Sequence, residues 1–321
     1  MSMPVELPLD DQTKRQMTRG EEKMEAPLQR TKRRLTSRWA TLAAIVIAVF
    51  WSVPTLGLLI TSFRPRQEIQ TSGWWTIFQN WGFTLDNYVA ALQAGNSQLT
   101  LAGSFVNSFA ITIPATVIPI TIAMLAAYAF AWMDFKGKNM LFIFVFALQI
   151  VPIQMALIPL LQFFSQGEIF GVPVIQAFGS AGGYTQVWIA HAIFGLPLAI
   201  FLLHNFVSEI PAEVIEAARV DGAGHGQIFF RIVIPLTMPA IASIAIFQFL
   251  WVWNDLLVAL MFADGNVAPI TKMVAELAGS RGQDWYLLTA GAFIAVIVPL
   301  IVFLALQRYF VRGLLAGSTK G

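Results

Sequence analysis

Apolar and polar segments alternate along this chain, and the apolar segments are long and nearly free of charge. Six of them cover residues 39–61, 104–132, 139–164, 184–206, 235–262 and 285–310. A helix rises about 1.5 Å per residue, so about 20 apolar residues suffice to cross the hydrocarbon core of a bilayer. The pattern therefore predicts an all-α integral membrane protein with six transmembrane helices.

Every predicted span contains at least one proline, such as Pro54 in the first and Pro197 in the fourth. An interior proline removes one backbone hydrogen bond and kinks the helix. We therefore expect six kinked helices. They form a permease domain over residues 39–310, between a polar N-terminal tail of residues 1–38 and a short C-terminal tail of residues 311–321.

Lysine and arginine are distributed unevenly among the segments that join the spans. With the N-terminus in the cytoplasm, sixteen of the twenty Lys and Arg lie on the cytoplasmic side, and the other four are Arg64, Arg66, Lys272 and Arg281. Positive charge gathers on the cytoplasmic side of membrane proteins. The sequence thus predicts a multi-pass protein of the inner membrane whose N- and C-termini are both cytoplasmic.

Composition excludes several classes of function. Hydrophobic residues make up 57% of the chain, the formal net charge is +2, and cysteine is absent. A nucleic-acid-binding protein would gather its Lys and Arg into a basic patch, whereas here they follow the sides of the membrane. The three histidines, His191, His204 and His225, are too far apart in sequence for a metal motif. We expect neither a metal nor a cofactor in this chain, and no nucleic-acid partner.

The polar segment of residues 211–235 predicts two short helices joined by a turn. Pro211 suits the start of a helix because its missing N–H group is not needed there. The pair Ala217-Ala218 leaves a helix face without bulk, which another protein can approach closely. Asp221-Gly222 predicts the turn, with glycine supplying a positive φ, and we expect the second short helix to end near Pro235.

This segment resembles the EAA loop of the permease subunits of ABC importers. The resemblance is carried by Glu216-Ala217-Ala218, Asp221-Gly222-Ala223, Ile234-Pro235-Leu236 and Pro239, in a spacing that is specific to that family. In the family this loop is a cytoplasmic coupling helix that docks in a groove of an ATP-hydrolysing subunit. The resemblance therefore implies that Glu216, Ala217, Ala218, Asp221, Gly222, Ala223 and Pro235 couple the chain to an ATPase.

Three further segments resemble carbohydrate permeases of the maltose type, in particular their second permease subunit. They are Phe83-Thr84-Leu85-Asp86-Asn87-Tyr88, the segment Trp251-Val252-Trp253-Asn254-Asp255, and the C-terminal residues 311–321. The resemblance implies a sugar importer with four partners: a second permease, two copies of an ATP-binding subunit, and an extracytoplasmic sugar-binding protein. ATP would be hydrolysed by the partner subunits, since this chain lacks the GxxxxGK[ST] phosphate-binding motif.

Polar residues inside the apolar segments are candidates for a substrate path, because such groups usually face a bundle interior or an aqueous path. A sugar presents hydroxyl groups and apolar ring faces, and so requires amide or carboxylate groups beside aromatic rings. The candidates are Asn107, Gln149, Gln154, His191, Trp253, Asn254 and Asp255, with Gln162 and Gln248 as further polar positions. For any one of them a hydrogen bond between helices is the alternative role.

Two other functions are compatible with a polytopic membrane protein. An intramembrane enzyme, such as a hydrolase using His191 or Asp255, should show convergent acid, base or metal residues. An ion-coupled secondary carrier should show inverted internal repeats. Neither feature is visible in the sequence, and neither function explains the EAA loop. For an importer, α-glucosides, disaccharides and glucosyl-polyols all stay open as substrates.

Overall fold

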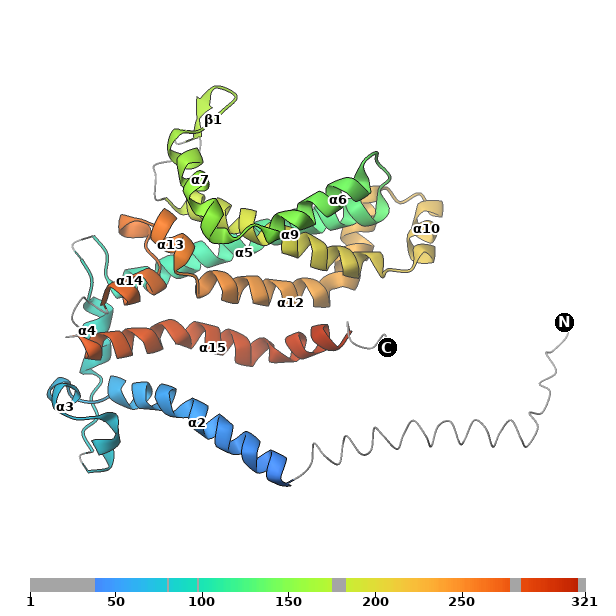
Figure 1. Cartoon of the computed structure of the whole chain (residues 1–321). Coiled ribbons are helices and arrows are strands. Elements are labelled where there is room, and N and C mark those ends of the chain that lie inside the picture. Colours follow the sequence, from blue (N-terminus) through green and yellow to red (C-terminus); the bar gives the residue numbers. More distant parts are fainter. Residues whose placement is uncertain (1–37, 80, 97, 175–182, 278–283, 317–321) are drawn as a thin grey trace, which may run out of the picture. The chain divides into compact units, whose positions relative to one another are not determined.

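The computed structural model describes residues 38–316 apart from 80, 97, 175–182 and 278–283, and beyond residue 306 it describes only the backbone. Nearly all of the predicted N-terminal tail, and residues 317–321 of the C-terminal tail, lie outside the described residues. The chain divides into two compact units, residues 1–60 and 61–321. The first contains most of helix α2, and all other described elements belong to the second (Figure 1).

The structure is almost entirely helical, as the sequence predicts. Its elements are α2(Arg38–Ser62), α3(Arg66–Thr71), η1(Trp74–Phe78), α4(Asp86–Gln93), α5(Leu101–Trp132), α6(Lys138–Ala147), η2(Leu148–Ile150), α7(Ile153–Gln166), β1(Glu168–Ile169), β2(Val172–Pro173), α9(Tyr184–Ser208), α10(Ala212–Val220), α11(His225–Ile228), η3(Phe229–Val233), α12(Ile234–Trp253), α13(Leu257–Phe262), η4(Gly265–Val267), α14(Ile270–Leu277) and α15(Trp285–Ala316). The two short strands pair antiparallel in a single hairpin within the described part of the chain.

Five helical segments are long and apolar enough to cross a membrane, and a bent pair brings the number to six. The five are α2, α5, α9, the stretch from His225 to Trp253, and α15 as far as Leu306. The pair is α6 with η2, followed by α7, with an angle of 102° between its halves. The third span, predicted over 139–164 as one kinked helix, is thus divided into two helices that point in different directions.

The bend in the third span follows from its sequence. Pro152 disfavours helical backbone at Val151 and ends helix η2 before it, and Val151 has ψ 118° in the extended region. A new helix then begins at Ile153 behind Pro152. The interruption at Pro152 thus divides the span into two helices.

The fifth span also differs from its predicted bounds of 235–262. Helix α12 ends at Trp253, and the short helix α13 begins at Leu257. Asn254 donates from its side chain to the carbonyl oxygen of Leu250 at 2.7 Å, and Asp255 accepts from the N–H group of Ala259 at 3.1 Å. Side chains of this kind compete with helical hydrogen bonds and favour helix ends.

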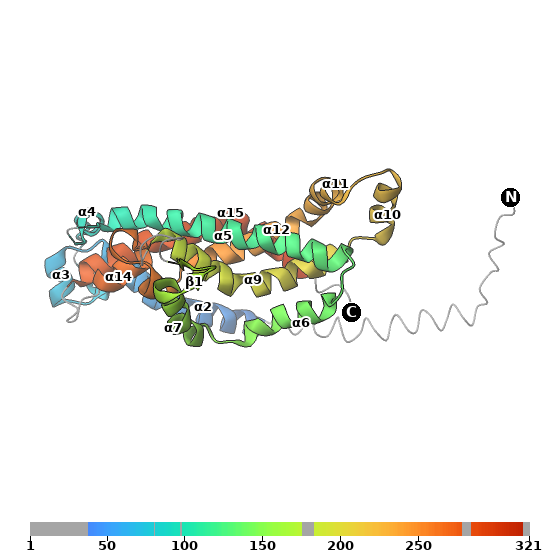
Figure 2. The ribbon, with the colours of Figure 1, turned by 90° about the horizontal axis from the view of Figure 1, so that it is seen from above.

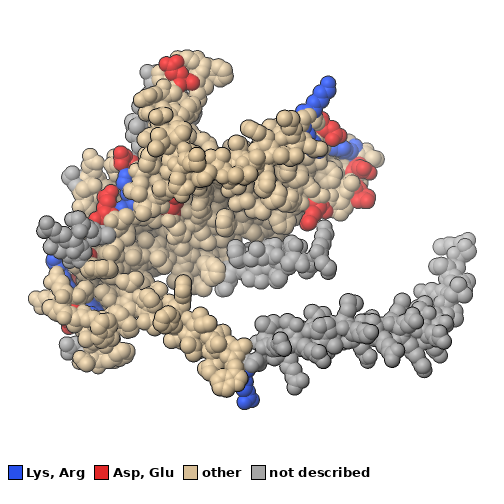
Figure 3. All heavy atoms as spheres, viewed as in Figure 1, with Lys and Arg blue, Asp and Glu red and all other residues tan. Residues whose placement is uncertain are grey.

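Helices α5, α9, α12 and α15 of the second unit run side by side (Figures 1 and 2), and α12 packs against the other three. Helix α10 lies at one end of this bundle and α3, α4 and α14 lie at the other. Most charged side chains visible on this unit in Figure 3 gather near these two ends, and the surface between them is largely uncharged. This distribution is typical of a protein whose middle lies in a lipid bilayer.

The end of the bundle that holds α3 is organised by a buried arginine. Arg64 is 1% exposed, and its guanidinium donates to the carbonyl oxygen of Ser72 at 3.1 Å and to the hydroxyl groups of Ser72 and Thr76 at 2.6 and 3.1 Å. The amide of Asn87 donates to the carbonyl oxygens of Ser62 and Arg64. These bonds fix the segment before α5 and compensate for removing a charge from water.

Candidate functional site

The segment that resembles the EAA loop forms a helix, a turn and a second helix at one end of the bundle (Figure 1). Helix α10 carries Glu216, Ala217 and Ala218, and the first two of these are exposed. Gly222 has φ 82° and lies in open space, because a β-carbon there would meet no atom within 4 Å. The predicted turn with a positive φ at Gly222 is confirmed.

Helix α10 is anchored to the ends of the long helices beside it. Its Ile215 is 1% exposed within the core. Arg219 donates to the carbonyl oxygen of Trp132, and the indole N–H of Trp132 donates to the carbonyl oxygen of Val207. These contacts connect α10 to the last residues of α5 and α9. Helix α10 is thus joined to the ends of two long helices.

The second half of the segment is not a separate short helix, and the predicted end near Pro235 is wrong. One helical stretch runs from His225 to Trp253, and it includes a π-helical turn, η3, directly before α12. Pro235 lies in the first turn of α12. A π turn changes the hydrogen-bond spacing locally, which is one way in which a long helix accommodates a proline ring. The long helix thus leads from the turn at Gly222 along the bundle to Trp253.

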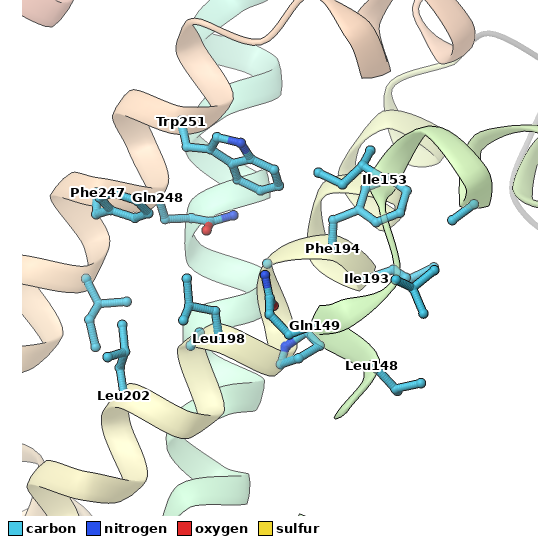
Figure 4. A pocket seen from close by; sticks show the side chains of 16 residues that line it. Leu148, Gln149, Ile153, Ile193, Phe194, Leu198, Leu202, Phe247, Gln248 and Trp251 are labelled. Carbon is cyan, nitrogen blue, oxygen red and sulfur yellow. The ribbon is translucent and has the colours of Figure 1, made fainter. Parts of the chain in front are cut away.

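A pocket of about 410 Å³ lies halfway along the bundle, between the break in the third span, α9 and α12. We call it the amide pocket; Gln149, Ile153, Gly195, Phe247, Gln248 and Trp251 are among the residues that line it. The amide groups of Gln149 and Gln248 point into it from opposite sides, and the indole of Trp251 lies over them (Figure 4). Its remaining walls are apolar. A pocket of this size and composition suits a small polar solute with an apolar face.

The break in the third span contributes directly to this pocket. Residues Leu148, Gln149 and Val151 line it, and they surround the point where helical hydrogen bonding stops. Interrupted membrane helices are found where irregular backbone borders a cavity rather than lipid, because free backbone groups need partners. The interruption thus places the side-chain amide of Gln149 and non-helical backbone at Val151 beside the pocket.

A second pocket, of about 700 Å³, lies on the neighbouring face of α12, toward α15. We call it the carboxylate pocket; Phe247, Trp251, Asn254, Asp255 and Phe303 are among its lining residues. Asn254 is exposed, and Asp255 has a side chain that is 11% exposed. Phe247 and Trp251 line both pockets.

His191 on α9 lies beside the two pockets and lines neither of them. Its Nε2 atom is 3.8 Å from Oδ2 of Asp255, and its ring meets the indole of Trp251 edge-on, with 5.5 Å between the ring centroids. The residue is 1% exposed, and Nδ1 has no hydrogen-bond partner among the described residues. His191 is thus held between the carboxylate and the indole.

The other polar residues predicted for a substrate path lie elsewhere. Asn107 donates to the carbonyl oxygens of Asn266 and Ala268 and accepts from the hydroxyl of Tyr184, so its amide connects three elements. Trp253 is 2% exposed and donates to the carbonyl oxygen of Ala295. Gln154 is exposed but lines neither pocket. Of the predicted residues, the structure brings Gln149, Asn254 and Asp255 to the two pockets, with His191 behind them.

The central aromatic residue of this arrangement is Trp251 rather than Trp253. The two residues are separated by two positions on α12, so they face different sides of the helix. Residue type does not distinguish them, because both are tryptophans in the same helix. A spacing of four residues from Phe247 to Trp251 and of three from Gln248 to Trp251 was the signal that could have placed them on one face.

The family model for the inner membrane component of binding-protein-dependent transport systems matches residues 118–315. The chain belongs to this family. It is accordingly a transport permease and not an enzyme, and the interpretation as an intramembrane hydrolase is wrong. A permease of this family works with a substrate-binding protein and ATPase subunits, and it resides in the inner membrane.

Two relatives are similar over almost their whole length. The osmoprotective compounds uptake permease protein GgtD of Synechocystis is 52% identical, over 89% of this chain and 95% of the relative. The alpha-glucoside transport system permease protein AglG of Rhizobium meliloti is 39% identical, over 90% of this chain and 99% of the relative. The resemblance to carbohydrate ABC permeases that was drawn from the motifs is confirmed.

The fold is also that of a solved importer. A chain of a bacterial alginate ABC transporter, crystallised in complex with an alginate pentasaccharide-bound periplasmic protein, superimposes with a TM-score of 0.61. The alignment covers 87% of this chain and 97% of that chain at 16% sequence identity. At this identity the likeness shows the fold alone.

Proposed function

We propose that this chain is the second permease subunit of an ABC importer for α-glucosides that serve as osmoprotective solutes, such as a glucosyl-polyol. The names of the two relatives support this substrate class, since one transports osmoprotective compounds and the other α-glucosides. A small glucoside fits both descriptions. In this proposal the solute passes along α12 through the carboxylate pocket and then the amide pocket.

The observation that carries the proposal is the amide pocket. Gln149 and Gln248 offer carbonyl acceptors and N–H donors to sugar hydroxyl groups, while the indole of Trp251 offers a flat surface to an apolar ring face. A volume of about 410 Å³ is within the range for small-molecule sites. A charged solute would find no ionised side chain among the residues that line this pocket.

A second permease would complete the path. Helix α6 has no buried residue, and on α12 the side chain of Phe247 is 52% exposed next to both pockets. These surfaces are apolar, so lipid or another membrane protein must cover them. A partner permease in this position closes the open sides of the pockets, and each of the two chains then forms half of the path.

Coupling to ATP hydrolysis would use α10, at the cytoplasmic end of the bundle. Two copies of an ATPase subunit bind and hydrolyse ATP, and this chain binds no cofactor. Glu216 and Ala217 are exposed and available for docking, while Arg219 and Ile215 hold α10 to the bundle. Closure of the ATPase pair then moves α10 and switches the bundle between two states.

The test is ATP hydrolysis and uptake by the complete importer, reconstituted in liposomes with its substrate-binding protein. The panel contains a glucosyl-polyol, an α-linked disaccharide, a β-linked disaccharide, an amino acid and a polyamine. We expect the α-glucosides alone to stimulate ATP hydrolysis and to accumulate in the liposomes. Stimulation by the amino acid or the polyamine, without stimulation by any glucoside, would refute the substrate class.

A further inference from the structure

Trp251 occupies the boundary between the two pockets. It lines both of them, as does Phe247 one helical turn before it. The polar groups that a solute can meet lie on either side of this boundary: Asn254 and Asp255 in the carboxylate pocket, and Gln149 and Gln248 in the amide pocket. A solute that passes from one pocket to the other must therefore pass the indole of Trp251.

The Trp251 ring packs edge-on against His191. The two rings meet at an interplanar angle of 87°, with the imidazole 1% exposed and therefore confined by its surroundings. An edge-on contact of this kind has a defined geometry, since the positive edge of one ring faces the negative face of the other. A change in the position of the imidazole changes the surface on which the indole rests.

His191 in turn lies next to the carboxylate of Asp255. Nε2 of His191 and Oδ2 of Asp255 are 3.8 Å apart, and the same oxygen accepts the N–H group of Ala259 at the start of α13. Asp255 lines the carboxylate pocket, where a sugar hydroxyl can donate to its carboxylate. Inside a membrane protein such an interaction is strengthened by the low dielectric. Occupation of this pocket thus alters the environment of His191.

We propose that Trp251 is a gate between the two pockets, and that His191 is a positioning residue that couples solute binding at Asp255 to the orientation of this gate. The proposal rests on the proposed path along α12. His191 itself contacts no solute. It acts through Trp251, which distinguishes it from the residues that line the pockets.

A double-mutant cycle on the complete importer tests this coupling. Uptake of an α-glucoside at limiting concentration is measured for Trp251→Ala, His191→Gln and the double variant, with transport normalised to the amount of complex. Loss of an edge-on aromatic contact should lower the uptake efficiency of His191→Gln about 2- to 12-fold. In the Trp251→Ala background the same substitution should have no further effect, because the ring on which His191 acts is gone.

Selectivity provides a second readout. Because the gate sets the width of the passage, His191→Gln should change the ratio of uptake between a glucosyl-polyol and a longer α-glucoside. A general loss of folded protein would lower both rates and leave the ratio unchanged. His204→Gln is the matched control: it lies on the same helix and contacts Phe142 at 4.4 Å between ring centroids. Its effect should be the same with and without Trp251.

The outcomes separate the two proposals. If the losses of His191→Gln and Trp251→Ala multiply in the double variant, the coupling is refuted while the path stands. If neither Trp251→Ala nor Asp255→Asn changes uptake, the proposed path itself is wrong. If His191→Gln prevents assembly, Asp255→Asn replaces it in the cycle. The coupling is supported if Asp255→Asn has no effect in the Trp251→Ala background. It is refuted if the losses of the two single variants multiply.

Discussion

Gly195 on α9 faces the amide of Gln248 on α12 so closely that a β-carbon would lie 2.7 Å from Nε2 and 2.8 Å from Oε1. The same amide donates from Nε2 to the carbonyl oxygen of Ala115 at 3.3 Å. Because position 195 is glycine, the side chain of Gln248 can reach between α5 and α9. This arrangement fixes one polar wall of the amide pocket.

Gly195→Ala should consequently impair transport more than it impairs folding. The new methyl group meets the far end of a flexible side chain, so the amide of Gln248 can move away at little expense to stability. The same movement removes the amide from its position in the pocket. We expect normal amounts of complex in the membrane and an uptake KM that rises several-fold, as measured in reconstituted liposomes.

Gly291→Ala on α15 is the control for this change. A β-carbon there would lie 3.4 Å from the nearest atoms, which belong to Leu101 and Val274, and far less must move. Gly291→Ala should therefore leave the KM for uptake unchanged. An unchanged KM in Gly195→Ala as well would show that Gln248 takes no part in the path.

Asn107→Leu should act on stability rather than on selectivity. The substitution leaves the carbonyl oxygens of Asn266 and Ala268 and the hydroxyl of Tyr184 without their partner. Each buried polar group that loses its partner costs about 1–3 kcal/mol. We expect a clear fall in the amount of detergent-extracted complex and in its thermal midpoint, with an unchanged ranking of sugars. An altered ranking with a normal thermal midpoint would instead place Asn107 in the path.

The sequence predicted the spans well because their length and lack of charge are direct consequences of the bilayer. The predicted and observed starts agree at Tyr184 and Trp285, and they differ by three residues for the second span. The angle of 102° between α6 and α7 could not be predicted. Proline at position 152 indicates a disturbance, but whether the helix kinks or divides depends on the helices that pack around it.

Only part of the candidate site could be predicted from the sequence. Polar residues in apolar spans are few, so Gln149 and Asp255 were found by composition alone. Composition does not distinguish a residue that lines a pocket from one that joins helices, as Asn107 does. The role of Trp251 depends on where α12 ends and on the partner that His191 provides from another helix. Such contacts between distant segments are not visible in a single sequence.

Gly222→Val should separate ATP hydrolysis from transport. Its φ of 82° is in the left-handed region, and a β-branched residue held there costs about 1–3 kcal/mol in backbone strain. No neighbouring atom would clash, so the strain is relieved by a change in the turn, which tilts α10. We expect normal membrane abundance, loss of uptake, and ATPase subunits that no longer respond to the solute-loaded binding protein.

Gly224→Val is the matched control in the same turn. Position 224 also has open space around it, but its φ of −76° and ψ of 166° suit a β-branched residue. It should therefore transport nearly as well as the parent protein. Asparagine tolerates the left-handed region, so Gly222→Asn should recover part of the activity. Equal activity in Gly222→Val and Gly224→Val would show that the turn does not transmit the signal.

The orientation of the bundle can be measured directly, since the chain has no cysteine and each introduced cysteine is unique. Lys136, in the turn between α5 and α6, Val220, at the end of α10, and Ala275, on α14, are all exposed. From the asymmetry of Lys and Arg we expect cysteines at 136 and 220 to be cytoplasmic and a cysteine at 275 to be external. A membrane-impermeant maleimide added to intact cells should label only position 275, and permeabilised cells should be labelled at all three. Labelling of position 220 in intact cells would place α10 outside, where no ATPase can reach it, and would refute its role in coupling.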